Sequence, residues 1–345
     1  MSDPARTACT KGVSSRIAGA AVRGMALSLS FALAAASAYE PDWGTLILEH
    51  ENDLFAGEDR YYTSGARLTW LSPDDRVPGW VRAGSDLVPF FSREGELKLS
   101  YSLGQNMYTA EDITLEDPDP DDRPYAGWLY FTVGLGAQTE ERLDRLQLSV
   151  GVIGRASLAD RLQRQVHRHL EAPQPAGWDT QLENEPTLLL TYERQWRQLA
   201  GDAGNGLGWD ATPYVGGSVG NVFTQLTTGV TGRLGWRLPN DWGPPRIQPA
   251  LPGSGVFRAQ SDYGGYVFLS LDGRAVGRDI FLDGNTFRDS RSVDKRYLVG
   301  EIQTGVVVNV TRRVRIAYTH VFPTREFRGQ EGTQDFGSLS LSAHF

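Results

Sequence analysis

Apolar and polar side chains alternate with a period of two along most of the chain. Residues 96–103 show the pattern clearly, because Leu97 and Leu99 fall on one face and Lys98 and Ser100 on the other. The same alternation recurs in residues 128–136, 145–152, 267–275 and 338–345. A period of two is typical of β-strands that have one apolar face. We therefore expect an all-β protein.

The alternating runs and the turn signals between them predict twelve strands. These are expected near residues 45–52, 61–72, 96–108, 126–138, 143–154, 186–197, 209–223, 225–237, 262–277, 294–310, 312–325 and 335–345. An even number of antiparallel strands is typical of bacterial outer-membrane barrels. Because no linker or internal repeat interrupts the series, residues 39–345 are expected to form a single domain.

The N-terminal region has the pattern of an export signal. Basic Arg16 and Arg23 precede the apolar run 25–35, and small residues follow it at 36–38. This order of a basic region, a short apolar region and a small-residue cleavage site predicts a signal peptide over residues 1–38. Beyond it, no stretch holds the roughly 20 consecutive apolar residues that a membrane-spanning helix needs.

The net charge and the cysteine content make several classes of function less plausible for this chain. The chain has a formal net charge of −8, and residues 1–38 carry four basic side chains and one acidic one, so the remainder carries about −11. Bulk electrostatics therefore disfavour nucleic-acid binding. Cys9 is the single cysteine and lies within the predicted signal, so the mature chain is expected to have no disulfide and no thiol nucleophile. No protein partner is indicated, and we expect a monomer.

Strands with one apolar and one polar face fit two architectures. A soluble sandwich buries its apolar faces between two sheets, whereas a membrane barrel turns them outward to lipid. The export signal, the abundance of Gly, Ser, Thr and charged residues on the polar face, and a final strand that ends on Phe345 all favour the barrel. We therefore predict a transmembrane antiparallel β-barrel of about twelve strands in the outer membrane of a Gram-negative cell.

The order of the predicted strands groups the polar segments at one end of the barrel. If the N-terminus starts in the periplasm, the connections after odd-numbered strands face outward. The segments around 52–60, 109–125 and 155–185 would then share the extracellular rim. Two long stretches, 73–95 and 238–261, fall on the periplasmic side. We interpret them as small periplasmic helices or plugs.

Candidate chemistry is concentrated between the first two predicted strands. Residues 50–55 read His-Glu-Asn-Asp-Leu-Phe, and residues 59–65 read Asp-Arg-Tyr-Tyr-Thr-Ser-Gly. Antiparallel pairing of the flanking strands would bring Asn52 and Asp53 near Thr63. The alternative is an ordinary polar loop, because Asn and Asp are common in turns for local reasons.

The segment 156–170 predicts a short helix within one of the connections on the same rim. Leu158, Leu162 and Val166 recur at intervals of four and share a face. Gln163 and His167 are also neighbours four residues apart. Histidine is well suited to act as a general base near neutral pH, and a helix lying on the rim would hold it over the barrel wall. The alternative is a solvated surface histidine.

Four ordered blocks of sequence resemble the lipid A 3′-O-deacylase family of Gram-negative outer-membrane proteins. The first is Glu-Asn-Asp at 51–53 followed by Asp-Arg-Tyr-Tyr-Thr-Ser-Gly at 59–65, and the second is Asp-Arg-Pro-Tyr-Ala-Gly-Trp at 122–128. The third runs through 151–154 and Gln-Arg-Gln-Val-His at 163–167, and the fourth is Gly-Trp-Asp-Thr-Gln-Leu-Glu-Asn-Glu-Pro at 177–186. The likeness is densest over 46–195.

The resemblance implies a twelve-stranded barrel that removes the ester-linked 3′-acyloxyacyl group of lipid A by calcium-dependent hydrolysis. The active site of this family lies between the outer barrel wall and a loop helix, beside the outer leaflet. Matched by motif, the candidate catalytic residues are Asn52, Asp53, Thr63 and His167, and the candidate substrate-binding residues are Tyr62, Arg123 and Gln163.

The likeness departs from the family pattern at two positions. The acidic residue expected after the histidine is replaced by Pro173, so its neighbour Glu171 and Asp53 are the candidate calcium ligands. No clear counterpart of a family lysine occurs within 111–122. Calcium prefers oxygen ligands of this type.

Two other functions fit a barrel of this kind. An outer-membrane phospholipase or esterase acting on another acylated lipid would need a serine paired with a histidine, but no histidine of the mature chain has a serine two positions later. A non-enzymatic pore or binding barrel would use the charged lumen, where Asp272 and Arg274 either line a channel or pair with each other.

Overall fold

The computed structural model describes residues 43–53, 62–73, 76–85, 88, 91, 95–197, 199–243 and 263–345. The predicted signal at 1–38 lies outside these residues. The strands are β1 (Thr45–Asn52), β2 (Tyr62–Leu71), β3 (Glu96–Tyr108), β4 (Ala126–Gln138), β5 (Arg142–Ile153), β6 (Glu185–Trp196), β7 (Leu199–Gly204), β8 (Leu207–Gly220), β9 (Phe223–Trp236), β10 (Gly264–Asp279), β11 (Leu298–Asn309), β12 (Val314–Pro323) and β13 (Phe336–His344). The helices are α2 (Gly79–Ser85), α3 (Ala159–Leu170) and α4 (Ile280–Asp283), with 3-10 turns η2 (Arg155–Ser157) and η3 (Gly177–Thr180).

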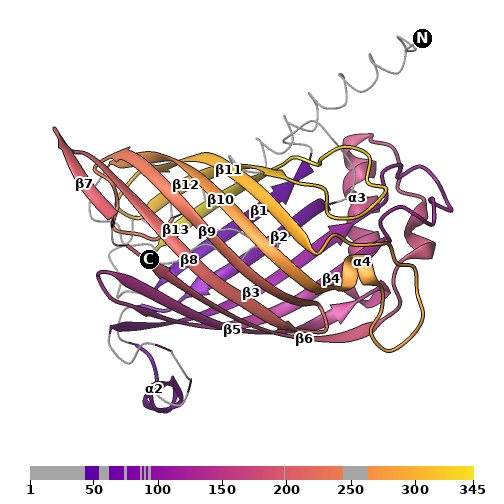
Figure 1. Cartoon of the computed structure of the whole chain (residues 1–345), viewed down its shortest axis with the longest axis horizontal. Helices are drawn as coiled ribbons and strands as arrows, with labels where there is room; N and C mark the ends of the chain where they lie inside the picture. Colours follow the sequence, from indigo (N-terminus) through magenta and orange to yellow (C-terminus); the bar gives the residue numbers. More distant parts are fainter. Residues whose placement is uncertain are drawn as a thin grey trace, which may run out of the picture.

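Twelve of these strands close into a barrel. Each strand pairs antiparallel with its neighbours in sequence, except that β6 pairs with β8 and β1 pairs with β13 to complete the ring. The short β7 forms a side hairpin with the start of β8. Figure 1 shows α3 and α4 at one end of the barrel, and α2 and β7 at the other. We call the first end the α3 rim; it holds the connections that follow β1, β3, β5, β8, β10 and β12.

The strands turn their apolar faces outward. In β1, Leu46 and Leu48 are 37% and 41% exposed, whereas the alternate residues Glu49 and Glu51 are 1% and 2% exposed. This arrangement is the reverse of a soluble sandwich and is the one that a lipid-facing barrel requires. The predicted barrel is therefore confirmed. Among the helices of the described residues, none is long and apolar enough to cross a membrane.

The charged residues that face the lumen are paired. Arg67 forms a two-pronged interaction with Glu49, with both N–O distances 2.7 Å. Further pairs join Arg233 to Asp210 and Asp241, Arg315 to Asp241, and Arg145 to Glu193. On the outer face near the opposite end, Arg194 also pairs with Asp144 at 2.6 Å. Pairing offsets the cost of removing these charges from water.

Aromatic side chains fill the lumen at the α3 rim. The ring of Phe281, in α4, stacks on Tyr108 with the centroids 3.9 Å apart. Trp128 stacks on Tyr130 at 4.0 Å, and both belong to the same buried cluster as Phe281. Asp279 accepts a hydrogen bond from the Phe281 amide and so begins the turn. This plug at the barrel mouth argues against the pore interpretation.

The structure differs from the predicted strand pattern in few places. β7 was not predicted, because its sequence is glycine-rich and lacks alternation. The hairpin turn at Asn205 and Gly206, with φ values of 54° and 78°, is of the kind that Asn-Gly favours. The stretch 73–95 contains α2, in agreement with the small helix expected there. Most of 238–261 lies outside the described residues.

Candidate active site

One row of outward-facing positions crosses β1 to β4 near the α3 rim. Asn52 pairs with Ser64, Ser64 pairs with Met107, and Met107 pairs with Gly127. Neighbouring strands lie about 4.8 Å apart, so the row spans roughly 14 Å. These four positions form a continuous patch of the outer wall, and its β3–β4 half carries α3.

Helix α3 rests directly on the wall at Gly127. A Cβ atom at this position would lie 2.2 Å from the Ser157 Oγ and 2.3 Å from the Ala159 Cβ, so only glycine allows this contact. The Gln105 side chain, which faces outward from β3, donates its Nε2–H to the Ser157 carbonyl at 2.6 Å. The start of the helix is therefore attached to both strands.

The helix turns polar side chains toward the barrel and apolar ones away from it. Ala159, Gln163 and His167 share one face and are buried. Leu158, Leu162 and Val166 lie on another face and are 46%, 43% and 43% exposed. The helix thus carries the amphipathic pattern predicted from the sequence, but it is the polar face that packs on the wall.

The orientation of His167 is set by a backbone group. Its Nδ1 lies 2.6 Å from the carbonyl oxygen of Pro173. Because a carbonyl can only accept, the proton is on Nδ1, and in the neutral ring Nε2 keeps its lone pair. The chain reaches this position through Glu171, whose φ of 54° ends the helix, and the Ala172 amide donates to the His167 carbonyl.

Gln163 is held by a tryptophan from η3. The Trp178 Nε1–H donates to the Gln163 Oε1 at 2.6 Å, and the Trp178 ring packs edge-on against Tyr125 at 5.2 Å. Since an indole can only donate, the amide oxygen must face Trp178. The buried Gln163 Nε2 has no hydrogen-bond acceptor among the described residues. One helical turn from His167, Gln163 therefore has a buried N–H donor that no described residue accepts from.

Thr63 and Asp53 lie where β1 and β2 meet the same rim. The β2–β3 pairing has a bulge between Tyr62 and Ser64, which leaves Thr63 as the extra residue. The Thr63 Oγ1 lies 2.8 Å from the Thr109 Oγ1, directly after β3. Asp53 follows β1 and is fully buried. Four predicted catalytic residues therefore share one rim over β1–β4, as the sequence indicated.

Comparison with known protein families shows which family the chain belongs to. A sequence profile described as outer membrane protein LpxR matches residues 24–345. The chain belongs to this family. The structure of LpxR from Salmonella typhimurium is similar, with a TM-score of 0.72 and 20% sequence identity, covering 88% of this chain and all of that one. A search of curated proteins finds no match. The outer membrane is therefore the location of this LpxR-family barrel.

Other solved barrels are more distant. The β domain of the Bordetella autotransporter BrkA is 10% identical with a TM-score of 0.44 over 88% of this chain and 99% of that one. The KdgM porin in complex with oligogalacturonate is 6% identical with a TM-score of 0.35 over 87% and 99%.

Two residues predicted to bind substrate lie inside this LpxR-family barrel instead of on the patch beneath α3. The Tyr62 hydroxyl donates to the Glu51 Oε2 at 2.8 Å in the lumen. The Arg123 guanidinium contacts the Glu326 carboxylate at 2.5 Å and lies over the Tyr108 ring. Arg123 is 2% exposed. The structure therefore gives no geometric support for substrate contact by these two side chains.

Asp53 and Glu171 are the two acidic residues that were predicted to bind calcium. No group of three or more His, Cys, Asp or Glu side chains converges in the parts of the chain that the structure describes. Asp53 is a buried carboxylate of the kind that calcium binds, whereas Glu171 is exposed at the end of α3.

Several residues that position the site were not among the predicted site residues. Gln105 and Ser157 attach the helix, the Pro173 carbonyl orients His167, and Trp178 orients Gln163. Trp178 lies in the fourth block of the family resemblance, which is the signal that pointed to it. A backbone carbonyl such as that of Pro173 leaves no such signal.

Proposed function

We propose that this LpxR-family protein hydrolyses the ester-linked 3′-acyloxyacyl group of lipid A in the outer leaflet. The observation that carries the proposal is His167, which is held between α3 and the lipid-facing wall with its Nε2 as the basic atom. A base at this place meets an acyl ester of a membrane lipid and not a soluble substrate. The α3 rim then faces the cell exterior.

His167 acts first as a base and then as an acid in the proposed reaction. The His167 Nε2 removes a proton from a water molecule as the water oxygen bonds to the ester carbonyl carbon. The tetrahedral intermediate then expels the sugar oxygen, which takes the proton back from His167. One ester and one water give one carboxylic acid and one alcohol, so the histidine is regenerated.

Neighbouring polar groups place the ester. The free Nε2–H of Gln163 is a donor for a carbonyl or phosphate oxygen of the lipid. Asn52 and Thr63 hold the sugar end of the substrate at the edges of β1 and β2. The exposed side chains of Leu158, Leu162 and Val166 contact acyl chains on the outer side of the helix.

Calcium is part of the proposal. When bound by Asp53, a calcium ion supplies positive charge that stabilises the oxyanion of the intermediate. The proposed dependence is tested by removing divalent ions with a chelator and restoring calcium or magnesium separately. Loss of hydrolysis that only calcium restores supports the proposal; unchanged hydrolysis in chelator contradicts it.

The function itself is tested in cells. Lipid A is extracted from Gram-negative cells that express the chain and from cells that do not, and both are analysed by mass spectrometry. The proposal predicts a new species that lacks one acyloxyacyl group. An unchanged lipid A accompanied by hydrolysis of phospholipid would support the esterase alternative instead.

A further inference from the structure

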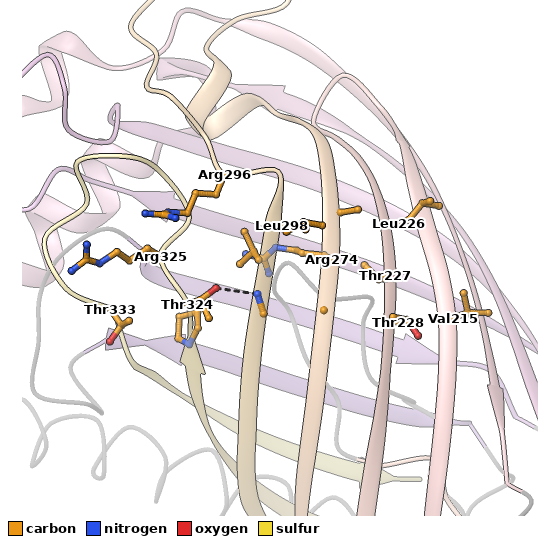
Figure 2. Close-up of a pocket in the computed structure, with 15 residues that line it drawn as sticks. Val215, Leu226, Thr227, Thr228, Arg274, Arg296, Leu298, Thr324, Arg325 and Thr333 are labelled. Carbon is orange, nitrogen blue, oxygen red and sulfur yellow. Dashed lines mark hydrogen bonds between the residues drawn. The ribbon is translucent and has the colours of Figure 1, made fainter.

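A groove lies on the wall opposite α3. In the closed ring of twelve strands, β10 is six strands from β3 in either direction. The groove has a volume of about 990 Å³ and is lined by β8–β12 and by the connections that follow β10 and β12 at the α3 rim. It is thus separate from the patch that holds His167. Figure 2 shows its lining residues.

Small residues form the floor of the groove. Gly273 on β10 pairs with Thr228 on β9 and with Gly300 on β11. The Gly300 amide in turn donates to the Thr324 Oγ1 at 3.0 Å. A Cβ atom at Gly273 would have nothing within 4 Å, so the space above it is open.

Bulky apolar residues border this floor. On the side of the α3 rim, Leu226 and Leu298 are 70% and 77% exposed. On the other side, Leu271 and Ile302 are paired and are 50% and 48% exposed. A channel of small residues between apolar ridges on a lipid-facing wall fits an acyl chain.

Two arginines stand at the rim end of the groove. Arg296 and Arg325 are brought together because the Arg296 amide donates to the Glu326 carbonyl at 2.7 Å. Figure 2 shows both side chains extending to the same side. Neither guanidinium has an ion pair or hydrogen bond with the described part of the chain. Among the described residues that line the groove, none carries a carboxylate.

We propose that this groove binds a second lipid A molecule, which is not the one hydrolysed beside α3. Its acyl chain lies along the floor at Gly273 and Gly300, and its phosphate contacts Arg296 and Arg325. Guanidinium groups bind phosphate through two parallel hydrogen bonds, and the absence of lining carboxylates leaves their charge available. Neither histidine nor acid lines the groove, so the site binds lipid without reacting with it.

The test counts bound lipids by native mass spectrometry of the purified full chain. Lipid A is titrated into the detergent-solubilised barrel in the His167→Ala background, which limits turnover. We expect two bound copies. Gly273→Leu fills the space above the floor, and the double variant Arg296→Gln/Arg325→Gln removes charged hydrogen bonds to the phosphate. Each variant is expected to weaken binding of the second copy about tenfold or more.

Matched control variants distinguish an effect on the groove from a general effect of the same kind of substitution. Gly232→Leu places the same side chain on the outer face of β9 outside the groove, where the nearest atom to a new Cβ is the Leu269 carbonyl oxygen, 3.9 Å away. Arg288→Gln/Arg328→Gln removes two exposed arginines of the same rim. Both controls are expected to keep two copies. The arginine variant leaves the wall unchanged, so it remains informative if Gly273→Leu fails to fold.

Three results would overturn the proposal. These are a single bound copy in the parent protein, a second copy that survives both groove variants, and equal displacement of that copy by phosphatidylglycerol at the same concentration. The count does not depend on hydrolysis. Failure of this site is therefore distinguishable from failure of the proposed deacylase activity.

Discussion

The Nδ1–H of His167 donates to the backbone carbonyl of Pro173 across 2.6 Å. Pro173 occupies the position where the family resemblance led us to expect an acidic side chain. A carbonyl fixes the tautomer as a carboxylate would, but it does so without a negative charge. The orientation of the base therefore depends on the path of the backbone just after α3.

Replacing His167 tests its role as the base. His167→Ala is expected to lower the rate of lipid A hydrolysis by about 10²–10⁴-fold, the usual contribution of a general base. His169→Ala is the matched control, because His169 is exposed two residues away on the same helix. The assay is the rate of release of the acyloxyacyl acid by purified protein. Equal losses in both variants would count against the assignment.

Gly127 tests whether the helix must rest on the wall. Gly127→Ala adds a methyl group where Ser157 and Ala159 leave no space, so α3 must move outward. A displacement of about 1 Å at a catalytic group can cost roughly a hundredfold in rate. We expect that loss with the barrel still folded, as judged by circular dichroism.

The control for Gly127 lies on the same strand. At Gly136 the nearest atoms to a new Cβ are 4.0 Å away, so Gly136→Ala is expected to leave the rate unchanged. If Gly127→Ala were fully active, the close contact between helix and wall would not be required for catalysis.

Gln163 can be changed without losing its contact with Trp178. Gln163→Glu retains an oxygen that accepts from the indole and removes the free N–H donor. We expect a tenfold to hundredfold lower rate, about the effect of one lost charged or transition-state hydrogen bond. Tryptophan fluorescence should be unchanged. Gln165→Glu, on the exposed face, is the control, and a similar loss there would indicate a general effect of charge on the helix.

The contribution of Glu326 to the stability of the barrel mouth is expected to depend on pH. Burial alone would raise its pKa, but Arg123 and Arg274 outweigh that effect and hold the pKa below its ordinary value of 4.5. A depressed pKa means that the stabilisation is present above about pH 4.5 and is lost as the pH falls through the lower, folded-state value.

Glu326→Gln should therefore lower the free energy of unfolding at neutral pH by roughly 3 kcal/mol, because the buried Arg123 loses its ion-pair partner and Arg274 keeps only Glu301. The difference from the parent should shrink at acidic pH. Heat-dependent gel migration of the folded barrel at several pH values measures both effects. Glu183→Gln, at an exposed position, should show neither. A constant difference across the pH range would contradict this explanation.

The barrel strands could be predicted because the alternation of apolar and polar residues is a local pattern in the sequence. Alternation needs only neighbouring residues, and it placed all twelve barrel strands to within a few residues. β7 escaped prediction because Gly201 and Gly204 leave no side chains to alternate. The helix at α3 was also predictable, since its periodicity lies within a single segment.

The sequence was a poorer guide to whether a site side chain faces the lumen or the outer wall. A bulge of one residue at Thr63 turns Tyr62 into the lumen, although the motif places both residues side by side. Arg123 also lies in a family block, but it pairs with Glu326, about 200 residues away in sequence. Facing direction and long-range pairing follow from the register of the whole sheet, which no short motif contains.

The most direct measurement is the mass of purified lipid A after incubation with the purified barrel in calcium-containing detergent buffer. The account predicts loss of one acyloxyacyl unit with the parent protein and with His169→Ala, and an intact lipid A with His167→Ala. Lipid A that keeps its full mass in the presence of the folded parent protein, or that is cleaved equally well by His167→Ala, would contradict the account.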